Sequence, residues 1–498
     1  MSLANFYEDS EIFVTGGSGV VGKALIEKLL RSCNVRRIYV LLRPRRQLSA
    51  EQRLVKLRQA TIFHVLHQEK PDELDKLVAV PGDVLLPGLG IDPAMAAQMS
   101  KVSLVYHCAA TVRFDEPLRV ALQLNVGGTF EAIKFAETLA HLRVFVHVST
   151  FYSNPYLKFV EPKYYSSPMD WRLCLRVIDE VPDDGMLNAL TRKLIVGFPN
   201  TYTFTKNLAE SLVNDYRCRL PLIIYRPSIV LFAVDDPSPG FSPSLMGAMG
   251  LFALVGAGIL KTVYLGKETR LDITPQDVGI KCMLSYTKKG QEKYQKGPPK
   301  EIPVYMSSSC THVPHTFTQI AEQMDTLGLW KKAAFEKSLM VPGCHYTDRR
   351  WVYQFLVFTK QILPALLIDL LLRLFGKRPQ LMGVVRKAYQ TLEVMQPFMF
   401  NNYDSPGVTE KDEISKENHG TDFHLNPFTD PDINGLVIRV SGQMLYSIRA
   451  HLFKEDPCTL PRSQRIHTIK TIIYQGLRLI LLYKLVRWIW ASYLGQHF

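Results

Sequence analysis

The feature that most constrains this chain is a glycine turn near its start, in the segment FVTGGSGVVG at 13–22. Apolar residues before the turn predict a buried strand, and apolar residues at helical spacing after it predict a helix. Gly16, Gly19 and Gly22 lie between them, three residues apart. A dinucleotide pyrophosphate needs such a turn, because it approaches the backbone closely above the positive end of a helix dipole. Glycines also mark ordinary loops, but this strand–turn–helix setting favours a nucleotide site.

The same setting predicts an α/β fold, a Rossmann-type doubly wound parallel sheet. A mainly helical, membrane-associated C-terminal domain is expected to follow it, because the last third of the chain contains long apolar segments at 351–375 and 466–494. The G-x-x-G-x-x-G spacing resembles the extended short-chain dehydrogenase/reductase superfamily. The cofactor-binding residues predicted in the turn are Thr15, Gly16, Ser18, Gly19, Val20, Val21 and Gly22.

An arginine cluster follows the second predicted strand, at 37–42. Arg43 lies roughly 20 residues beyond the last motif glycine, where NAD-preferring folds usually place an acidic residue for the ribose 2′-hydroxyl. A basic cluster suits a 2′-phosphate instead, so we predict NADPH, with Arg43 and Arg46 as ligands. The alternative is that these arginines are simply solvated.

Composition narrows the class of partner. The chain has 498 residues, with 59 lysines and arginines against 46 aspartates and glutamates. This excess suits nucleic acid, an anionic membrane or a polyanionic substrate such as a coenzyme A thioester. No zinc-finger spacing or Lys/Arg block supports nucleic acid, so we expect none. The eight cysteines are scattered, which predicts reduced thiols in a cytosol-facing protein.

Two further segments predict the chemistry. Tyr202 and Lys206 are four residues apart, which places both side chains on one helix face. A phenol can donate a proton to a carbonyl oxygen as hydride arrives, and an adjacent ammonium lowers the phenol's pKa and can hold the nicotinamide ribose. The predicted strand 144–148 ends at Ser149 and Thr150, and because strand positions alternate, only one hydroxyl should face the ligand. These four residues are the predicted catalytic set.

The small residues Ala109, Ala110 and Thr111 follow another predicted strand, at 102–108, and would let the nicotinamide pass over the strand ends. By resemblance to the superfamily, Asp83 and its neighbour Val84 would lie beside the adenine ring. The same resemblance makes Asn125 the structural asparagine that braces the active-site strand and helix. No metal is expected, since His64 and His67 lack further ligands.

The segments TGGSGVVGKALIEKLLRS, LLRP, FVHVSTFYSN, NTYTFTKNLAE and YRPSIV together resemble alcohol-forming fatty acyl-CoA reductases, the insect-type members above all. The resemblance implies reduction of a long-chain or very-long-chain acyl-CoA to a fatty alcohol. It also implies that two NADPH are consumed and that the aldehyde intermediate stays bound. Thr150, Tyr202 and Lys206 match the family's catalytic positions. Pro227, Ser228 and Ile229 match the segment that closes over the nicotinamide.

Domain organisation follows from composition and the same resemblance. We expect a reductase domain over 1–345, substrate-facing from about 230, then a family-specific domain over 346–460 and a membrane-associated helix over 461–498. The uncharged stretch 237–260 is interrupted by prolines, serines and glycines, which argues against a membrane span. The resemblance implies that it forms apolar walls or a lid around the acyl chain, and a core helix is the alternative. The segment 288–300, rich in Lys, Gly and Pro, is expected to be an exposed loop.

Two apolar segments point to a membrane. The segment 351–375 is interrupted by Lys360, Pro364, Asp369 and Arg373, so we expect a hairpin or re-entrant helix pair that touches the membrane or roofs the acyl pocket. The segment 466–494 contains four cations and ends near Trp488, Trp490 and Tyr493, as interfacial anchors do. It could span the bilayer with a tilt or lie in its plane.

Two other functions compete with acyl-CoA reduction. One is a sterol-type or other extended short-chain dehydrogenase, and the other is a non-catalytic acyl-CoA-binding membrane protein. A cytosol-facing active site on the endoplasmic reticulum is favoured over the peroxisome, because the C-terminal GQHF is not an S-K-L type signal. The sequence leaves open whether the protein forms a homo-oligomer.

Overall fold

The computed structural model describes residues 2–45, 47–242, 244, 248–270, 272–309, 315–406, 409–425 and 432–493. The chain forms two compact units, each assembled from three stretches of sequence. Unit 1 comprises Met1–Pro243, Thr269–His315 and Pro397–Leu436, and unit 2 comprises Ser244–Glu268, Thr316–Gln396 and Val437–Phe498. The domain boundaries predicted at 345 and 460 stay predictions.

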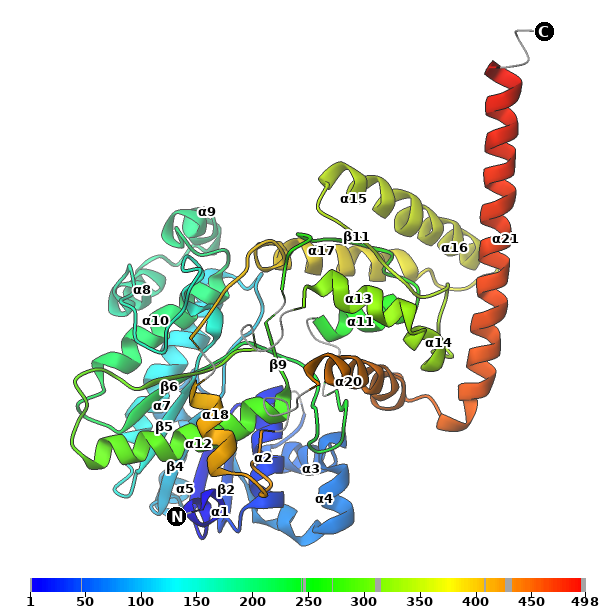
Figure 1. Cartoon of the computed structure of the whole chain (residues 1–498). Helices are drawn as coiled ribbons and strands as arrows, with labels where there is room; N and C mark the ends of the chain where they lie inside the picture. The colour runs from blue at the N-terminus through cyan, green and yellow to red at the C-terminus, as the bar shows by residue number, and fades with distance from the viewer. Residues whose placement is uncertain are drawn as a thin grey trace. The chain divides into compact units, whose positions relative to one another are not determined.

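Unit 1 is built on a seven-stranded sheet with the order β10-β6-β5-β4-β1-β2-β3, in which every neighbouring pair is parallel (Figure 1). The strands are β1 (Glu11–Thr15), β2 (Arg37–Leu42), β3 (Leu77–Pro81), β4 (Val102–His107), β5 (Val144–Val148), β6 (Leu222–Pro227) and β10 (Val304–Ser307). The order reverses at β1 and β4, which is the switch point where ligands bind in such sheets. The predicted doubly wound α/β fold is confirmed.

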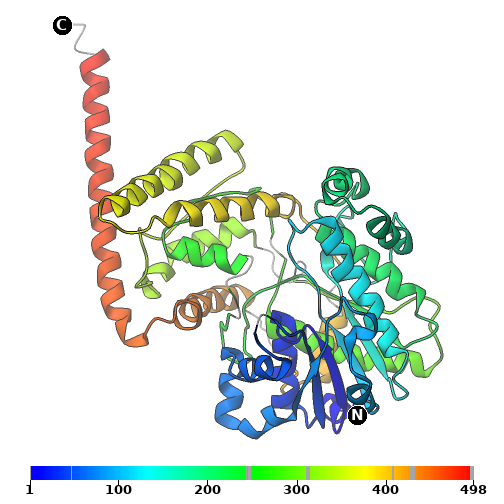
Figure 2. The same ribbon diagram turned by 180° about the vertical axis from the view of Figure 1, so that it is seen from behind.

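Helices cover both faces of this sheet, which Figure 2 shows from behind. On one face, α2 (Val20–Ser32) and α12 (Gln276–Gln295) pack through buried residues such as Leu25, Leu29 and Met283. On the other, α7 (Gly128–Ala136) and α10 (Thr201–Asp215) pack through Ile133, Leu208 and their neighbours. Strands that are buried on both faces appear in the sequence as continuous apolar runs, which explains why these strands could be predicted.

The remaining helices of unit 1 surround this core. They are α1 (Leu3–Tyr7), α3 (Ala50–Arg58), α4 (His64–Glu69), α5 (Pro93–Gln98), α6 (Leu118–Leu122), α8 (Trp171–Glu180), α9 (Asp184–Leu194) and α18 (Thr409–Glu417). Two short strands, β7 (Ile229–Val230) and β9 (Ile273–Thr274), pair in parallel beyond the end of β6. The loop predicted over 288–300 is wrong in its first part, because α12 continues to Gln295 with Lys288 and Lys289 partly exposed on it.

Unit 2 is mainly helical, as expected. Its helical segments are α11 (Ala248–Gly256), α13 (Phe317–Thr326), α14 (Leu329–Lys332), α15 (Arg350–Val357), η6 (Phe358–Ile362), α16 (Leu363–Leu374), most of α17 (Leu381–Met399), most of α20 (Ile433–Ser447) and α21 (Leu460–Tyr493). One small sheet pairs β8 (Thr262–Tyr264) with β11 (His345–Thr347). Within the predicted lid 237–260, residues 243 and 245–247 lie outside the described part, and α11 occupies 248–256.

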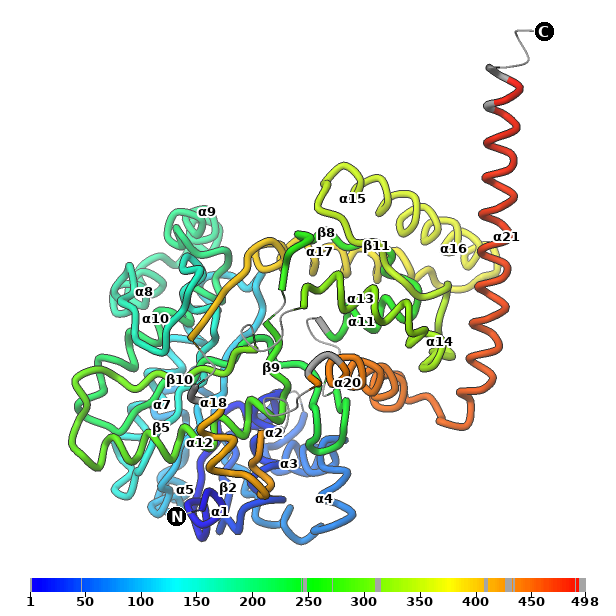
Figure 3. Tube along the Cα trace, viewed as in Figure 1, coloured from blue at the N-terminus to red at the C-terminus, as the bar shows by residue number. Residues whose placement is uncertain are grey.

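The segment 351–375 is a single helix, so the predicted hairpin is wrong. Figure 3 traces α15, η6 and α16 as one unbroken coil. Pro364 is tolerated because it stands at the start of α16, directly after the π-turn of η6, where an irregular turn already loosens the hydrogen-bond ladder. In the described part of the chain, Arg350–Leu374 is the helix that is long and apolar enough to cross a membrane by length and composition.

Candidate active site

The glycine turn lies at the carboxyl end of β1, pressed against the segment that follows β4. Gly16 has a φ of +70°, and a Cβ atom there would lie 2.6 Å from the backbone nitrogen of Ala109. A Cβ at Gly22 would lie 2.4 Å from the carbonyl oxygen of Gly16. No side chain caps the start of α2 at Gly19, so the amides of its first turn are open to an anion. The turn therefore has the geometry that a pyrophosphate requires.

Thr15 ties the two central strands together beneath the turn. Its Oγ1 lies 2.8 Å from Nδ1 of His107 and accepts a hydrogen bond from the Ala109 amide at 3.3 Å. The side chain of Thr15 is fully buried. It therefore holds the β1 and β4 ends in place, while Ala109, Ala110 and Thr111 remain partly exposed beside the turn.

A basic cluster stands at the end of β2. Arg43 is half exposed, and its Nη1 lies 3.4 Å from the Asp83 carboxylate, so these two predicted residues meet. Sequence reasoning missed Arg53 on α3, which donates to the Arg43 carbonyl oxygen at 2.5 Å and to the Ser18 hydroxyl at 3.4 Å. Burial, with the charges of Arg43 and Arg45, lowers the pKa of Arg53. A cluster of cations that destabilise one another is suited to an anionic ligand.

Arg53 could have been found from the helix start that precedes it. Ser49 and Gln52 form a capping box, which fixes the beginning of α3 shortly after the β2 arginines. Arg46 lies outside the described residues. Val84 is buried against Gly128 at the start of α7.

Tyr202 and Lys206 lie on the first two turns of α10, near the end of β5. Burial raises the pKa of Tyr202 to about 12, against the opposing effect of the nearby Thr150 hydroxyl. Lys206 donates from Nζ to the Val148 carbonyl oxygen at 2.6 Å, and burial lowers its pKa to about 8. The pKa of Tyr202 is thus raised overall, because burial outweighs the opposing effect of Thr150, and the expected lowering by the Lys206 ammonium stays a prediction. A neutral phenol remains, which is a proton donor at neutral pH.

The structure separates the two adjacent hydroxyls at the end of β5. Ser149 turns into the interior and donates to Oε1 of Glu210 at 2.5 Å. Thr150 lies on the other side, facing Tyr202, and accepts a hydrogen bond from the Tyr152 amide at 3.3 Å. This division follows from the alternation of side chains along an extended strand. Thr150, not Ser149, is therefore placed to contact a carbonyl oxygen together with Tyr202.

A buried ion pair behind Ser149 escaped sequence reasoning. Arg226 on β6 donates to both carboxylate oxygens of Glu210, at 2.9 and 2.7 Å, and both side chains are fully buried. Glu210 follows Lys206 by one helical turn, and its negative charge raises the pKa of Lys206 against the stronger effect of burial. Glu210 could have been noticed from that spacing, whereas Arg226, sixteen positions later on a strand, gives no local signal.

Two histidines lie side by side under Lys206. His107 on β4 and His147 on β5 stack with ring centroids 5.8 Å apart, and both are fully inside the protein. Burial, reinforced by the Lys206 charge, lowers the pKa of His107 to about 3 and that of His147 well below its ordinary value. Both rings are therefore neutral, and they do not compete with Tyr202 as proton donors.

Asn125 joins the loop after β4 to α10. Its Oδ1 accepts from the Thr111 amide at 2.8 Å, and its Nδ2 donates to the Thr111 carbonyl and to the Thr205 hydroxyl at 3.2 and 2.9 Å. At the end of β6, Ser228 lies 2.6 Å from the Thr274 hydroxyl, and Ile229 pairs with Ile273. These contacts hold in place the segments predicted to surround the nicotinamide.

Aromatic rings form a wall beside Tyr202. Phe114 lies 5.6 Å from the Tyr202 ring and 5.4 Å from Phe398, which also contacts Tyr152 at 5.0 Å. Tyr403 completes the group by an edge contact with Tyr152 at 5.4 Å. Phe398 and Tyr403 come from the last stretch of unit 1, so no local pattern could connect them to Tyr202.

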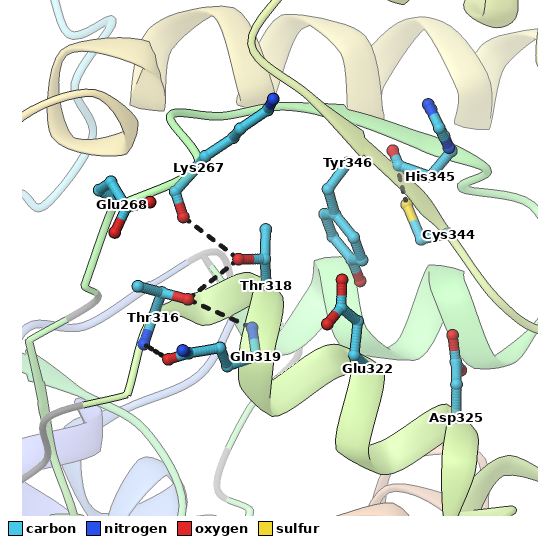
Figure 4. A pocket seen from close by; sticks show the side chains of 10 residues that line it. All are labelled: Lys267, Glu268, Thr316, Thr318, Gln319, Glu322, Asp325, Cys344, His345 and Tyr346. Atoms are coloured by element: carbon cyan, nitrogen blue, oxygen red, sulfur yellow. Dashed lines mark hydrogen bonds between the residues drawn. The ribbon is translucent and has the colours of Figure 1, made fainter.

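A separate cavity of about 400 Å³ lies in unit 2 (Figure 4). Three of its lining residues, Glu268, Glu322 and Asp325, carry carboxyl groups. Burial raises the pKa of Asp325. Such a lining is unsuited to the phosphates of coenzyme A or NADPH. The cavity contains none of the predicted site residues.

Comparison with known proteins identifies the family. An NAD-binding family model described as "Male sterility protein" matches residues 14–283. "Fatty acyl-CoA reductase wat" from Drosophila melanogaster is 33% identical over 497 residues, covering 97% of this chain and 92% of that protein. The chain belongs to the fatty acyl-CoA reductase family.

Other relatives support this assignment. "Fatty acyl-CoA reductase 1" from Gallus gallus is 32% identical, covering 81% of this chain and 77% of that protein. "Fatty acyl-CoA reductase 2" from Homo sapiens is 29% identical and covers 95% and 90% respectively. The match of this chain to an NAD-binding family model supports a nicotinamide cofactor.

Solved structures agree on the fold. The terminal R domain from the myxalamid PKS-NRPS biosynthetic pathway aligns with a TM-score of 0.56 at 17% identity, covering 89% of this chain and 91% of that one. The reductase domain of a nonribosomal peptide synthetase from Mycobacterium tuberculosis gives 0.54 at 18% identity, with 88% and 92% coverage. At this level of identity the likeness concerns the fold alone.

Proposed function

We propose that this reductase converts long-chain or very-long-chain fatty acyl-CoA into primary fatty alcohol, consuming two NADPH per acyl chain through an aldehyde. The observation that carries the proposal is the placement of Thr150 beside a partly exposed, neutral Tyr202, next to Lys206 and the open glycine turn. The names of the relatives supply the substrate class.

The residues present suit NADPH. The glycine turn accepts a pyrophosphate, and Arg43, Arg45 and Arg53 form a cationic cluster suited to a 2′-phosphate. When bound, NADPH supplies the hydride for both reductions. Lys206, held by the Val148 carbonyl oxygen, would bind the nicotinamide ribose and keep a positive charge beside it.

The protein's own groups then act on the substrate oxygen. In the first reduction, the hydroxyls of Thr150 and Tyr202 stabilise the oxyanion that develops on the thioester carbonyl, and the tetrahedral adduct collapses to aldehyde and free coenzyme A. In the second, Tyr202 gives its proton to the aldehyde oxygen, which becomes the alcohol. Its raised pKa keeps the phenol protonated until that step.

The aromatic wall supports a fatty substrate. Phe114, Tyr152 and Phe398 present apolar surface next to the Tyr202 ring, where the carbons nearest the reacting carbonyl would lie. Burying methylene groups against such surface is favourable by about 0.8 kcal/mol per CH₂. A polar sugar substrate would gain nothing comparable.

Association with a lipid membrane is part of the proposal, with the endoplasmic reticulum favoured over the peroxisome. The middle of α21 exposes large apolar side chains on all sides, including Ile472, Leu481 and Trp488. Exposed apolar surface of that extent marks a membrane or protein contact. A water-insoluble product fits the membrane.

The test is product analysis from membranes that contain the protein, given mixed acyl-CoA chains with NADPH or NADH. We expect fatty alcohols with NADPH and none in Tyr202→Phe, although that variant should still bind nucleotide. An absence of alcohol from every acyl-CoA, with nucleotide binding intact, would overturn the proposal in favour of a sterol-type dehydrogenase or a non-catalytic protein.

A further inference from the structure

The helix Arg350–Leu374 in unit 2 has two opposite faces, one buried and one exposed. One face is a buried stripe that packs against the rest of the unit. The members of the stripe are Tyr353, Val357, Gln361, Ala365 and Asp369, none more than 7% exposed. They recur at every fourth position.

The π-turn of η6 keeps this stripe straight. In a regular α-helix, positions four apart drift by about 40° per step, so five of them would wind about 160° around the axis. The wider turn at Phe358–Ile362 takes up one additional residue and reverses about 100° of that drift. The whole helix can therefore present one face to the protein and the opposite face outwards.

The outward face is apolar and uncovered. It lies opposite the buried stripe on both sides of η6. Its members are Trp351, Phe355, Phe358, Leu363, Leu367, Leu370 and Leu374, each between 42% and 73% exposed. Over the 23 steps from Trp351 to Leu374 this face is about 35 Å long. We call it the outer face of the helix.

Hydrogen bonds hold the buried stripe, here called the inner stripe, to the rest of unit 2. The Gln361 side-chain oxygen accepts hydrogen bonds from the Lys261 and Thr262 amides of β8, at 2.7 and 3.1 Å. The Asp369 carboxylate accepts three backbone N–H groups at the start of α17, from Gln380, Leu381 and Met382, at 2.9–3.0 Å. If the helix crossed a bilayer on its own, these groups would lose their partners in hydrocarbon, which is strongly unfavourable.

The exposed charges along the outer face are positive, apart from Asp348 just before the helix. Exposed cations flank it along its length, while the one carboxylate between 349 and 380 is the capped Asp369. These cations are Arg349, Arg350, Lys360, Arg373, Lys377 and Arg378. Cations beside an exposed apolar face are typical of helices that lie on anionic lipid.

We propose that the outer face of Arg350–Leu374 inserts in the plane of an anionic lipid bilayer, while the inner stripe stays packed on unit 2. The helix thus enters the membrane without crossing it. The proposal deepens the membrane association stated above and rests on it.

The positive charges around the outer face argue against a second copy of this chain as its binding partner. A symmetric dimer through the outer face would bring the same patch of cations against itself. Like charges across an interface are unfavourable, whereas anionic headgroups neutralise them.

A probe on the outer face tests insertion directly. In the full chain with the exposed Cys218 and Cys458 replaced by serine, Leu367→Cys is labelled with the environment-sensitive dye NBD. Vesicles of phosphatidylcholine with phosphatidylserine should shift its emission to the blue, and nitroxide lipids labelled near the headgroup should quench it at least as strongly as lipids labelled near the chain end. The matched control is NBD at Asn188→Cys, on the exposed helix α9, which should not respond.

Orientation is tested with cysteines at the two ends of the helix, Arg349→Cys and Lys377→Cys. In sealed vesicles, a membrane-impermeant maleimide should label both from outside. Protection of one end until detergent is added would show a crossing helix and overturn the proposal.

A charged variant completes the test. Leu367→Glu with Leu370→Glu should lower the vesicle partition coefficient about tenfold or more, whereas Asn188→Glu with Ala189→Glu should not. If the protein floats with vesicles but the probe at 367 does not respond, or responds only through a cross-linkable dimer, the outer face is not a membrane surface and this inference fails alone. If the protein does not float at all, the proposed membrane association fails as well.

Discussion

Glu210→Gln tests how much the active site depends on the buried ion pair behind it. The change removes the negative charge that faces Arg226 but keeps an oxygen and the side-chain volume. Arg226 then remains as a buried cation without a counter-charge, because it is fully enclosed with Glu210. Removing one partner of such a pair costs about 3–5 kcal/mol.

That cost should appear as a fall of about 5–15 °C in thermal unfolding. The matched control is Glu137→Gln. Glu137 forms an ion pair with Lys134 at 2.8 Å, close to the 2.7 Å of the Arg226–Glu210 pair, but on the surface. An exposed pair contributes about 1 kcal/mol or less, so the control should change the transition by about 3 °C at most. Circular dichroism or dye-monitored melting of the purified proteins measures both.

A second readout separates positioning from mere stability. Lys206 is faced by Glu210 on its own helix, by Cys108 after β4, and by His107 and His147 from the strands below. Among these, Glu210 is the group whose charge most raises the pKa of Lys206. Without it the pKa falls further, so the loss of activity on raising the pH should begin at a lower pH in Glu210→Gln. Equal melting and equal pH profiles for Glu210→Gln and the wild type would refute the reasoning.

Three other outcomes are expected. Gly16→Ala should abolish nucleotide binding measured by fluorescence titration, because its Cβ would meet the Ala109 backbone at 2.6 Å, whereas Gly88→Ala, with a similar positive φ but nothing within 4 Å, should retain binding. Arg53→Gln should raise the KM for NADPH about tenfold by removing a charge-assisted contact while leaving the KM for NADH unchanged, and equal effects on both would contradict a 2′-phosphate role. The rate of aldehyde reduction by the wild type should decline as the pH rises through about 8, where Lys206 loses its proton. A rate that does not change up to pH 10 would contradict a role for that charge.

The sheet and its ligand edge could be predicted from the sequence because their signals are local. The glycine turn, the apolar strands and the Tyr202–Lys206 spacing each fall within a few residues, and parallel strands gather their carboxyl ends at one edge. The alternation that separates Ser149 from Thr150 is equally local. Such features need no knowledge of the rest of the chain.

The features that were missed depend on distant partners. Arg226 meets Glu210 only because α10 packs against β6, and Phe398 meets Phe114 only after the chain returns to unit 1. The helix 350–374 was misjudged for a related reason. Its Asp369 looked like an interruption, but the carboxylate is satisfied by the backbone of the next helix, and the π-turn accommodates Pro364. Hydrogen-bond partners of this kind are invisible in composition.

The interleaving of the two units has a consequence for biosynthesis. The stretch Pro397–Leu436 belongs to unit 1, but the ribosome makes it after most of unit 2. It supplies Phe398 to the wall beside Tyr202, and Lys411 to a hydrogen bond with the Ser308 carbonyl oxygen. A nascent chain that has been synthesised as far as β10 therefore contains all seven strands of the sheet but lacks part of the active-site wall. The wall beside Tyr202 is therefore completed only after about a hundred further residues have been synthesised, and until then its apolar surface stays exposed.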